Sequence, residues 1–505
     1  MGVILSIIRA VNRSVDTFNN FIHGRWAPAR GGVTFGDENP AHRGSNLGAF
    51  QASTADDVRE AIDAAAGAFQ SWRKTSIAER QRYVAAFLNL LRESREDIAR
   101  IVTLENGKTI QESRAEVDSA LVEGGYHLQQ ATGFFGPPSL KLRRASQPGE
   151  MTTWVKLEPL GVVGIISPWN FPMNVMCRKT LPALLTGNTV VFKPATFTPW
   201  SGIYMARLFE QAGLPPGVFN CVTGLGSAIG NVLVEDPRVR AVSFTGSTAV
   251  GKQIQAKAAA NLTRTQLELG GKNALIVMGD ADVALAVAAA VTAGFSNAGQ
   301  WCTSTSRVLL HRKIATQFLD ALVAIANAMI VGDGLDESTE MGPVAGPQQH
   351  KDVSAAIRRA VADGARIAAG ADSSALPAGG YFVRPTVLTH VTQEMPAFRD
   401  EIFGPVLAVC EFESLDEALA LANNSMYGLS SGIYTTSEST AAAYVDGIEA
   451  GLAHVNVHTG YKEPSLPFGG IKQSGAGLPE NSETGLEFFV DRKAVYQRFS
   501  SGTKT

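Results

Sequence analysis

Apolar residues recur at helical spacing between residues 53 and 134. The sequence SIAE at residues 76–79 is typical of a capping box, which marks the start of a helix. Behind it Val84, Phe87 and Leu91 fall on one helical face. This part of the chain is therefore predicted to be helical.

From residue 151 the pattern changes to short β-rich runs that alternate with helical segments. The runs GVVGIIS, NTVVFKP, VFNCVTG and AVSFTG are separated by helices expected at residues 173–187, 198–212, 226–235 and 247–259. This alternation indicates a parallel sheet with crossover helices, as in a dinucleotide-binding domain. A second series of β-rich runs follows and contains NALIVM, RVLL, PTVLTHV and PVLAVCEF. The fold class is therefore predicted to be α/β, with two such domains.

Two further β-rich segments lie outside both series. TTWVKLEP covers residues 152–159, and EFFVDRKAVYQRF covers residues 487–499. We expect these segments to pair in a small separate sheet that serves oligomerisation.

Charge and composition narrow the classes of function. The 505 residues include 44 basic and 47 acidic side chains, and a net charge of -3 gives no basic surface for nucleic acid. The uncharged stretch 283–306 is rich in Ala, Thr, Ser and Asn, so we expect a buried helix and a polar loop rather than a membrane span. Residues 1–16 are expected to be a surface extension; their myristoylation pattern is the weaker alternative, and a signal peptide is not indicated.

The 4 cysteines lie far apart and include no C-x-x-C pair, which excludes a disulfide framework or a cysteine zinc site. They indicate a reduced, cytoplasmic protein. Cys302 lies in the polar sequence GQWCTSTSR, whereas Cys221 and Cys410 fall in apolar strands. A reactive thiol at Cys302 and a small packing residue are the two interpretations. His454 and His458 are separated by a strand-like sequence, so no metal site is predicted.

Two other motifs contain candidate catalytic groups. LELGGKN places Glu268 at an apolar strand end beside two glycines, which suits a general base with a raised pKa; a surface strand residue is the alternative. SPWNFP holds Asn170 in a turn fixed by two prolines. Its amide is a candidate donor to a developing oxyanion, and a purely structural corner is the alternative.

The sequence FTGSTAVGKQ fits G-x-x-x-x-G-K, but Gln253 stands where a nucleotide-hydrolysing P-loop needs Ser or Thr. A helix that begins near Ser247 can still bind a pyrophosphate through its free N–H groups, and simple capping by Ser247 or Thr248 is equally compatible. GLGSAIG at residues 224–230 is a weak nucleotide motif, because its glycines are spaced G-x-G-x-x-x-G.

Six motifs occur in this order along the chain: SPWNFP, FTGSTAVGK, LELGGKN, GQWC, EIFGPV and PFGGIKQSG. Because of these motifs the chain resembles the aldehyde dehydrogenase superfamily, from about Phe21 to about Phe499. The stretch 461–480 looks closest to the 2-oxoglutarate-semialdehyde type. The resemblance implies a Rossmann-like NAD(P)-binding domain, a catalytic domain, and a small sheet for a homodimer or homotetramer. The implied ranges are 17–139 and 160–267 for the cofactor domain, 268–480 for the catalytic domain, and 140–159 and 481–505 for oligomerisation.

The same resemblance implies roles for individual residues. Cys302 resembles the nucleophile that attacks the aldehyde, Glu268 the base that activates water, and Asn170 the oxyanion donor. Lys193 and Ser247 match residues that hold the ribose and pyrophosphate of NAD or NADP. The remaining expected cofactor contacts are Ile166, Trp169, Thr196, Gly226, Gly230, Phe244, Gly246, Gly270, Glu401 and Phe403.

Thr196 stands where NAD-preferring relatives often carry a glutamate that repels a 2′-phosphate, so NADP is expected to be accepted. Arg178 matches an arginine that binds the substrate carboxylate in semialdehyde dehydrogenases. A semialdehyde is therefore the expected substrate class, and pairing of Arg178 with an acid in its own helix is the alternative. Trp301 and Phe171, with Thr303 nearby, instead suit an aromatic or bulky aldehyde. A catalytically silent scaffold is disfavoured, because all three catalytic residues are present.

Overall fold

The structure is a computed structural model that describes residues 16–135, 151–372, 374 and 376–498. The predicted N-terminal extension lies outside the described residues except for Asp16. Part of the predicted oligomerisation segment, residues 140–150, lies outside them as well.

The helical prediction for residues 53–134 is confirmed. The helices there are α2 (Ala55–Trp72), α3 (Ile77–Glu93), α4 (Arg95–Asn106) and α5 (Ile110–Phe135). The Ser76 hydroxyl caps α3 by accepting a hydrogen bond from the Glu79 backbone N–H at 3.2 Å. The hydrophobic pattern does not predict the strands that precede these helices, because they are short and none of them has the continuous apolar sequence of a buried strand. They are β1 (Thr17–Phe18), β2 (Asn20–Ile22), β3 (Arg25–Ala27), β4 (Thr34–Glu38) and β5 (Asn46–Gln51).

The first predicted α/β series forms an eight-stranded sheet with the order β21-β11-β10-β7-β8-β9-β2-β3. Its central strands are parallel and buried on both faces, which explains their continuous apolar sequences. The strands from the series are β7 (Val162–Ile166), β8 (Thr189–Lys193), β9 (Phe219–Cys221), β10 (Val239–Thr245) and β11 (Arg264–Glu268). The helices between them are α6 (Pro172–Leu185), α7 (Pro199–Gln211), α8 (Gly226–Glu235) and α9 (Thr248–Ala258).

The strand order of this sheet reverses between β7 and β10. From β7 the chain proceeds outward through β8 and β9, and it then returns to place β10 and β11 on the other side. In open α/β sheets, ligands bind at the carboxyl ends of the strands that flank such a reversal. The short strand β21 (Gly475–Ala476), from the range predicted for the catalytic domain, pairs with β11 at the sheet edge.

The second series forms a seven-stranded sheet with the order β14-β15-β16-β13-β12-β18-β19. All neighbours in it are parallel except β14 and β15. Its strands are β12 (Asn273–Val277), β13 (Thr305–His311), β14 (Arg366–Ala369), β15 (Thr386–Thr389), β16 (Val406–Phe412), β18 (Ser430–Tyr434) and β19 (Leu452–Val455). Its helices are α10 (Val283–Phe295), α11 (Ala315–Ala328), α12 (Pro347–Ala362), α13 (Pro396–Arg399), α14 (Leu415–Asn423) and α15 (Glu438–Gly447).

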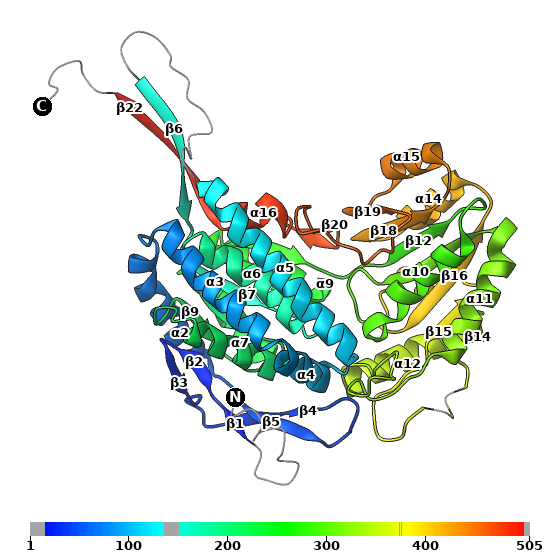
Figure 1. The fold of residues 1–505 in the computed structure, drawn as a ribbon, viewed down its shortest axis with the longest axis horizontal. Helices are drawn as coiled ribbons and strands as arrows, with labels where there is room; N and C mark the ends of the chain where they lie inside the picture. Colours follow the sequence, from blue (N-terminus) through cyan, green and yellow to red (C-terminus); the bar gives the residue numbers. More distant parts are fainter. Residues whose placement is uncertain (1–15, 136–150, 373, 375, 499–505) are drawn as a thin grey trace, which may run out of the picture.

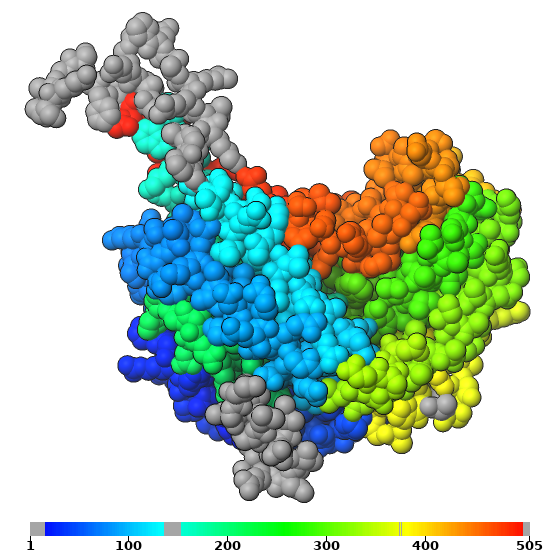
Figure 2. Space-filling model, in the orientation of Figure 1, coloured from blue at the N-terminus to red at the C-terminus, as the bar shows by residue number. Residues whose placement is uncertain are grey.

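The two sheets belong to separate bodies that lie side by side (Figure 1). Figure 2 shows the C-terminal segment, in orange and red, on the surface between α5 and the second body. This segment contains β20 (Ile471–Lys472), which pairs with β17 (Tyr427–Gly428), and the short helix α16 (Ser482–Glu487).

The predicted small sheet is present as a two-stranded arm of β6 (Met151–Pro159) and β22 (Val490–Arg498), which projects from the first body (Figure 1). The predicted start of the second strand at residue 487 is wrong. Glu487 ends α16, the adjacent Phe488 and Phe489 are both buried, and the strand β22 begins only at Val490. The oligomerising role of the arm stays a prediction.

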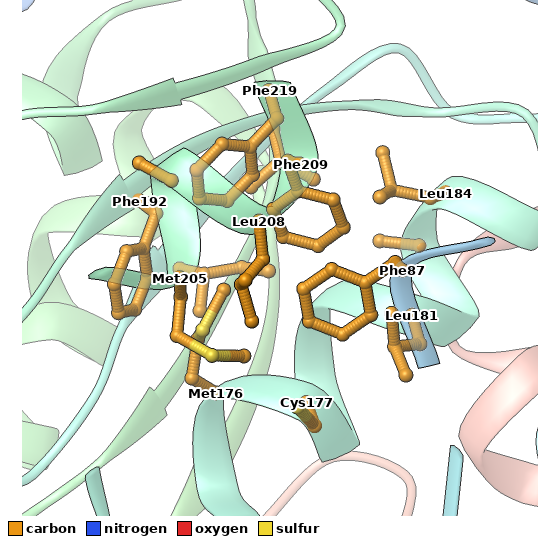
Figure 3. Close-up of a cluster of buried hydrophobic side chains, with 14 of the residues drawn as sticks. Phe87, Met176, Cys177, Leu181, Leu184, Phe192, Met205, Leu208, Phe209 and Phe219 are labelled. Carbon is orange, nitrogen blue, oxygen red and sulfur yellow. The ribbon is translucent and has the colours of Figure 1, made fainter. Parts of the chain in front are cut away.

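The N-terminal helices pack against the first sheet through a cluster of buried aromatic and aliphatic side chains (Figure 3). Phe87 of α3 stacks on Phe209 of α7 with ring centroids 4.1 Å apart, and Phe209 contacts Phe219 of β9 at 4.5 Å. The apolar stretch from residue 283 forms the largely buried helix α10 followed by a loop, as predicted. Among the described residues, no helix is long and apolar enough to cross a membrane.

Candidate active site

A cavity of about 380 Å³ brings together the three predicted catalytic residues, Cys302, Glu268 and Asn170. Glu268 ends β11, Asn170 follows β7, and Cys302 lies in the loop before β13. The residues thus come from both α/β bodies, and only the assembled fold places them around one space.

Cys302 is held by its backbone. Its carbonyl oxygen accepts a hydrogen bond from Asn273 Nδ2 at 2.8 Å. A Cβ atom on Gly271 would lie 2.9 Å from the same oxygen, so this close approach requires glycine. Burial, and next the nearby Glu268 carboxylate, raise the pKa of the thiol to about 12. The resting thiol is therefore protonated at neutral pH, and attack on a carbonyl carbon requires that its proton be removed.

Glu268 is buried, and its Oε2 atom has no hydrogen-bond partner among the described residues. Burial, and next the negative charge of Glu480, raise the pKa of Glu268 well above its usual range. This direction agrees with the sequence-based expectation. A carboxyl group with a raised pKa binds a proton readily, which is what general-base catalysis near neutral pH requires.

Asn170 lies in a turn that is fixed by hydrogen bonds. Its carbonyl oxygen accepts from Lys108 Nζ at 2.6 Å and from Asn297 Nδ2 at 3.1 Å. Its own Nδ2 donates to the Gln300 carbonyl oxygen at 3.0 Å. A primary amide has two N–H groups, so the second remains for an oxygen atom in the cavity.

Arg178 lines the cavity as predicted, but its side chain already has several partners. Its Nε and Nη2 atoms donate to the two carboxylate oxygens of Glu123 at 2.8 and 3.1 Å, and Nη1 lies 3.4 Å from Glu480 Oε2. Among the described residues, its partner within α6 is the amide of Asn174, at 2.7 Å. The alternative that Arg178 pairs with an acid in its own helix is therefore wrong, because Glu123 lies in α5 and Glu480 follows β21.

The other predicted substrate residues divide into two groups. Phe171 and Trp301 line the cavity with ring centroids 5.6 Å apart, and a Cβ on Gly460 would lie 2.6 Å from the Trp301 ring. Thr303 does not line the cavity: it is buried, and its backbone carbonyl accepts a hydrogen bond from the Thr459 hydroxyl at 2.8 Å.

Sequence reasoning assigned no role to part of the cavity wall. Some of these residues lie in or just before α5, which has no recognisable motif. Others lie in or just before the stretch 461–480, whose resemblance to a family does not indicate what each side chain contacts. They come from α5 and the residues before it, from the segment between β19 and β20, and from the residues after β21. The main ones are Lys108, Glu116, His458, Tyr461, Lys462, Phe468 and Glu480.

The predicted cofactor residues gather at the strand reversal of the first sheet. Ile166, Lys193 and Phe244 occupy one register at the carboxyl ends of β7, β8 and β10. Burial lowers the pKa of Lys193 to about 8, and its ammonium donates to the Pro194 carbonyl oxygen at 2.9 Å. The chain then passes Gly246 and enters α9, where the Ser247 hydroxyl accepts a hydrogen bond from the Val250 N–H at 3.4 Å. Ser247 is therefore the helix cap, and the free N–H groups of this first turn suit a pyrophosphate.

Gly226 opens α8 close to Lys193, with 4.0 Å between its ideal Cβ position and Lys193 Cε. Thr196 Oγ1 donates to the Gly224 carbonyl oxygen at 3.4 Å, and no acidic group stands at that position. A Cβ on Gly230 would meet nothing within 4 Å, so local packing does not require glycine there.

Glu401 and Phe403 reach the same region from the second body. The Glu401 carboxylate accepts a hydrogen bond from the Gly271 N–H at 3.0 Å, and a Cβ on Gly270 would collide with it. Burial raises the pKa of Glu401 to about 7. Phe403 adopts a positive φ of 55° and packs edge-on against Trp169 with ring centroids 5.5 Å apart. A backbone cradle at the strand ends and a carboxylate opposite it fit a dinucleotide.

Comparison with known proteins agrees with this geometry. The model of the "Aldehyde dehydrogenase family" matches residues 26–495. The alpha-ketoglutaric semialdehyde dehydrogenase of Bacillus subtilis is 38% identical over 95% of this chain and 98% of its own. The betaine aldehyde dehydrogenase of Rhizobium leguminosarum is also 38% identical, over 95% of this chain and 96% of its own.

Among solved structures, an NAD-dependent aldehyde dehydrogenase from Sinorhizobium meliloti superposes with a TM-score of 0.92 at 35% identity. The match covers 96% of this chain and 95% of that chain. Similarity of this extent covers both α/β bodies and the site between them. The protein belongs to the aldehyde dehydrogenase family and is an NAD(P)-dependent aldehyde dehydrogenase.

Proposed function

We propose that the substrate is an aldehyde that also carries a carboxylate, such as 2-oxoglutarate semialdehyde or succinate semialdehyde. The observation that carries this proposal is the cavity itself, where the basic side chains of Arg178 and Lys462 share the wall with Cys302 and Glu268. A carboxylate bound by a basic group would lie in the same space as the aldehyde carbon. The similarity to the alpha-ketoglutaric semialdehyde dehydrogenase of Bacillus subtilis supports the same class.

In the proposed reaction, Cys302 transfers its thiol proton to solvent water, and the thiolate adds to the aldehyde carbon to form a thiohemiacetal. The free N–H of the Asn170 amide donates a hydrogen bond to the oxyanion that develops. A bound NAD or NADP would supply the acceptor for the hydride of this carbon, and loss of that hydride would leave a thioester on Cys302. Ionised Glu268 then takes a proton from water, the resulting hydroxide adds to the thioester carbon, and the C–S bond breaks to release the acid.

The proposed cofactor site uses Lys193 and Ser247 for the ribose and pyrophosphate, and Glu401 and Phe403 for the nicotinamide ribose. We propose that NADP is accepted as well as NAD. Thr196 presents a hydroxyl rather than a carboxylate at the adenosine end, so a 2′-phosphate meets no negative charge there.

An aromatic aldehyde is the second candidate, and the ring arrangement favours it. Phe171, Trp301 and His458 follow one another along the wall, with ring centroids 5.6 and 6.3 Å apart. Such a surface binds a planar group by offset or edge-on contact. An aromatic substrate would leave the basic groups of the same cavity without a partner.

A panel of aldehydes separates the two candidates. Initial rates of NADH and NADPH formation are measured by absorbance for succinate semialdehyde, 2-oxoglutarate semialdehyde, benzaldehyde and butanal. The proposal predicts the highest kcat/KM for a semialdehyde. A higher kcat/KM for benzaldehyde or butanal than for both semialdehydes would contradict it.

A further inference from the structure

The proposed substrate carboxylate needs a donor on the cavity wall that still has a free N–H group. The lysine and arginine side chains that line the cavity are Lys108, Arg178 and Lys462. The acidic groups around them include Glu116, Glu123 and Glu480, so the wall as a whole is not strongly positive. Selectivity for an anion must therefore come from one donor with spare hydrogen-bonding capacity.

Lys108 has no such capacity. Its side chain is 0% exposed, and its ammonium donates to Glu116 Oε2 at 2.7 Å and to the Asn170 carbonyl oxygen at 2.6 Å. Its remaining side faces the Phe171 ring, whose centroid lies 4.0 Å away. The three donors of a lysine are therefore all committed.

Arg178 is nearly saturated as well. Its guanidinium makes two hydrogen bonds to Glu123, one to Asn174 and one to Glu480, which uses four of the five N–H groups of an arginine. The Phe468 ring covers the guanidinium with its centroid 4.5 Å away, and the side chain is 4% exposed. One N–H of this buried guanidinium remains, so a substrate carboxylate could bind Arg178 through two hydrogen bonds only by displacing one of these partners.

Lys462 differs from both. Its side chain is 23% exposed, its ammonium donates to Asn174 Oδ1 at 2.7 Å and pairs with Glu123, and its third N–H has no partner among the described residues. The loop that carries it is held by the Thr459 hydroxyl, which donates to the Thr303 carbonyl oxygen at 2.8 Å. His454 also bonds to the Tyr461 carbonyl oxygen, at 2.9 Å. Lys462 is therefore a fixed cation with one unused donor at the cavity surface.

We propose that Lys462 binds the carboxylate of the substrate, and that Arg178 is a positioning residue that holds Glu123 and Asn174 where they orient Lys462. This inference rests on the proposed function, since it assumes a substrate with a carboxylate. It assigns selectivity to Lys462, to which the family resemblance gives no role, rather than to the arginine that the resemblance indicates.

The test compares succinate semialdehyde with its methyl ester, which has nearly the same shape and no negative charge. In Lys462→Met we expect KM for the acid to rise about 10- to 100-fold, the effect of losing a charge-assisted hydrogen bond, while KM for the ester stays near wild type. Lys462→Arg should restore most of the loss for the acid. Lys472→Met is the matched control, because Lys472 is 25% exposed, pairs with Glu449, and lies outside the cavity lining.

The pH dependence of the wild-type enzyme gives a second test that needs no variant. Burial, and next the positive charge of Arg178, lower the pKa of Lys462 to about 8, while Glu123 and Cys302 oppose this shift. Above this pH the ammonium loses its charge, so KM for the acid should rise while KM for the ester does not rise with it. This measurement decides the matter if Lys462→Met fails to fold.

The outcomes separate this inference from the proposed function. If the wild-type enzyme oxidises the ester with a higher kcat/KM than the acid, the proposed substrate class is wrong. If the wild type prefers the acid but folded Lys462→Met impairs acid and ester equally, or neither, the substrate class stands and the role of Lys462 is overturned. Parallel pH profiles of KM for acid and ester would overturn it in the same way.

Discussion

Replacement of Glu268 by glutamine removes the proposed base and leaves its shape unchanged. The carboxyl is buried, one of its oxygens has no partner among the described residues, and burial raises its pKa, so the surroundings disfavour its charged form. Glutamine is neutral and of similar size. We therefore expect the free energy of unfolding to change by only about 1 kcal/mol.

The catalytic effect should be far larger and confined to one step. A positioned general base contributes about 10²- to 10⁴-fold, equivalent to about 3 to 5 kcal/mol of barrier. Formation of the thioester does not use the base in the proposed sequence, whereas its hydrolysis does. In Glu268→Gln the first turnover should proceed and the acyl-enzyme should then accumulate.

The assay is stopped-flow absorbance of the reduced nicotinamide, combined with intact-protein mass. Glu268→Gln should give a burst of about one NAD(P)H per active site. A steady state about 10²- to 10⁴-fold slower than wild type should follow, with the acyl group visible as added mass. Glu463→Gln, which removes an exposed carboxylate near the cavity loop, should resemble wild type. Equal slowing of burst and steady state, with no acyl adduct, would refute the assignment of Glu268 to thioester hydrolysis.

Two further predictions concern charge near the site. The negative charge of Glu480 raises the pKa of Glu268, so the variant Glu480→Gln should lower that pKa. The acid limb of the pH profile of thioester hydrolysis should then move to lower pH. An acid limb at unchanged or higher pH would refute the coupling between the two carboxyl groups. The variant Thr196→Glu places a carboxylate at the adenosine end of the proposed cofactor site. We expect kcat/KM to fall about tenfold or more with NADP and to change little with NAD. An equal fall with both cofactors would show that Thr196 does not contact the 2′-phosphate.

The sequence alone could predict those parts of the fold that depend on local pattern. The buried strands β7 and β8 and the amphipathic helix α3 have apolar runs or faces long enough to recognise. The strands β1 to β5 do not, because polar residues and glycines interrupt the longer ones and the others have only two or three residues. The end of α16 also escapes sequence reasoning, since Phe488 and Phe489 look like strand residues until the core around them is known.

The candidate site divides in the same way. Cys302, Glu268 and Asn170 each lie in a motif whose residue types indicate their chemistry, and the structure places all three on one cavity. The ion pairs of Arg178 with Glu123 and Glu480 join segments that lie far apart in the chain, so no local sequence pattern predicts them. The unused donor of Lys462 could not be predicted from the sequence either, because it depends on the partners and the exposure of this side chain in the folded structure.

The central claim is that Cys302 forms the covalent intermediate. It is tested most directly by the rate of aldehyde-dependent NAD(P)H formation in Cys302→Ser, with Cys410→Ser, a half-buried cysteine outside the cavity lining, as the control. A serine hydroxyl is a much weaker nucleophile than a thiolate, so we predict that Cys302→Ser loses about a thousandfold or more of the activity while Cys410→Ser retains it. Near-normal aldehyde oxidation by folded Cys302→Ser would contradict the account.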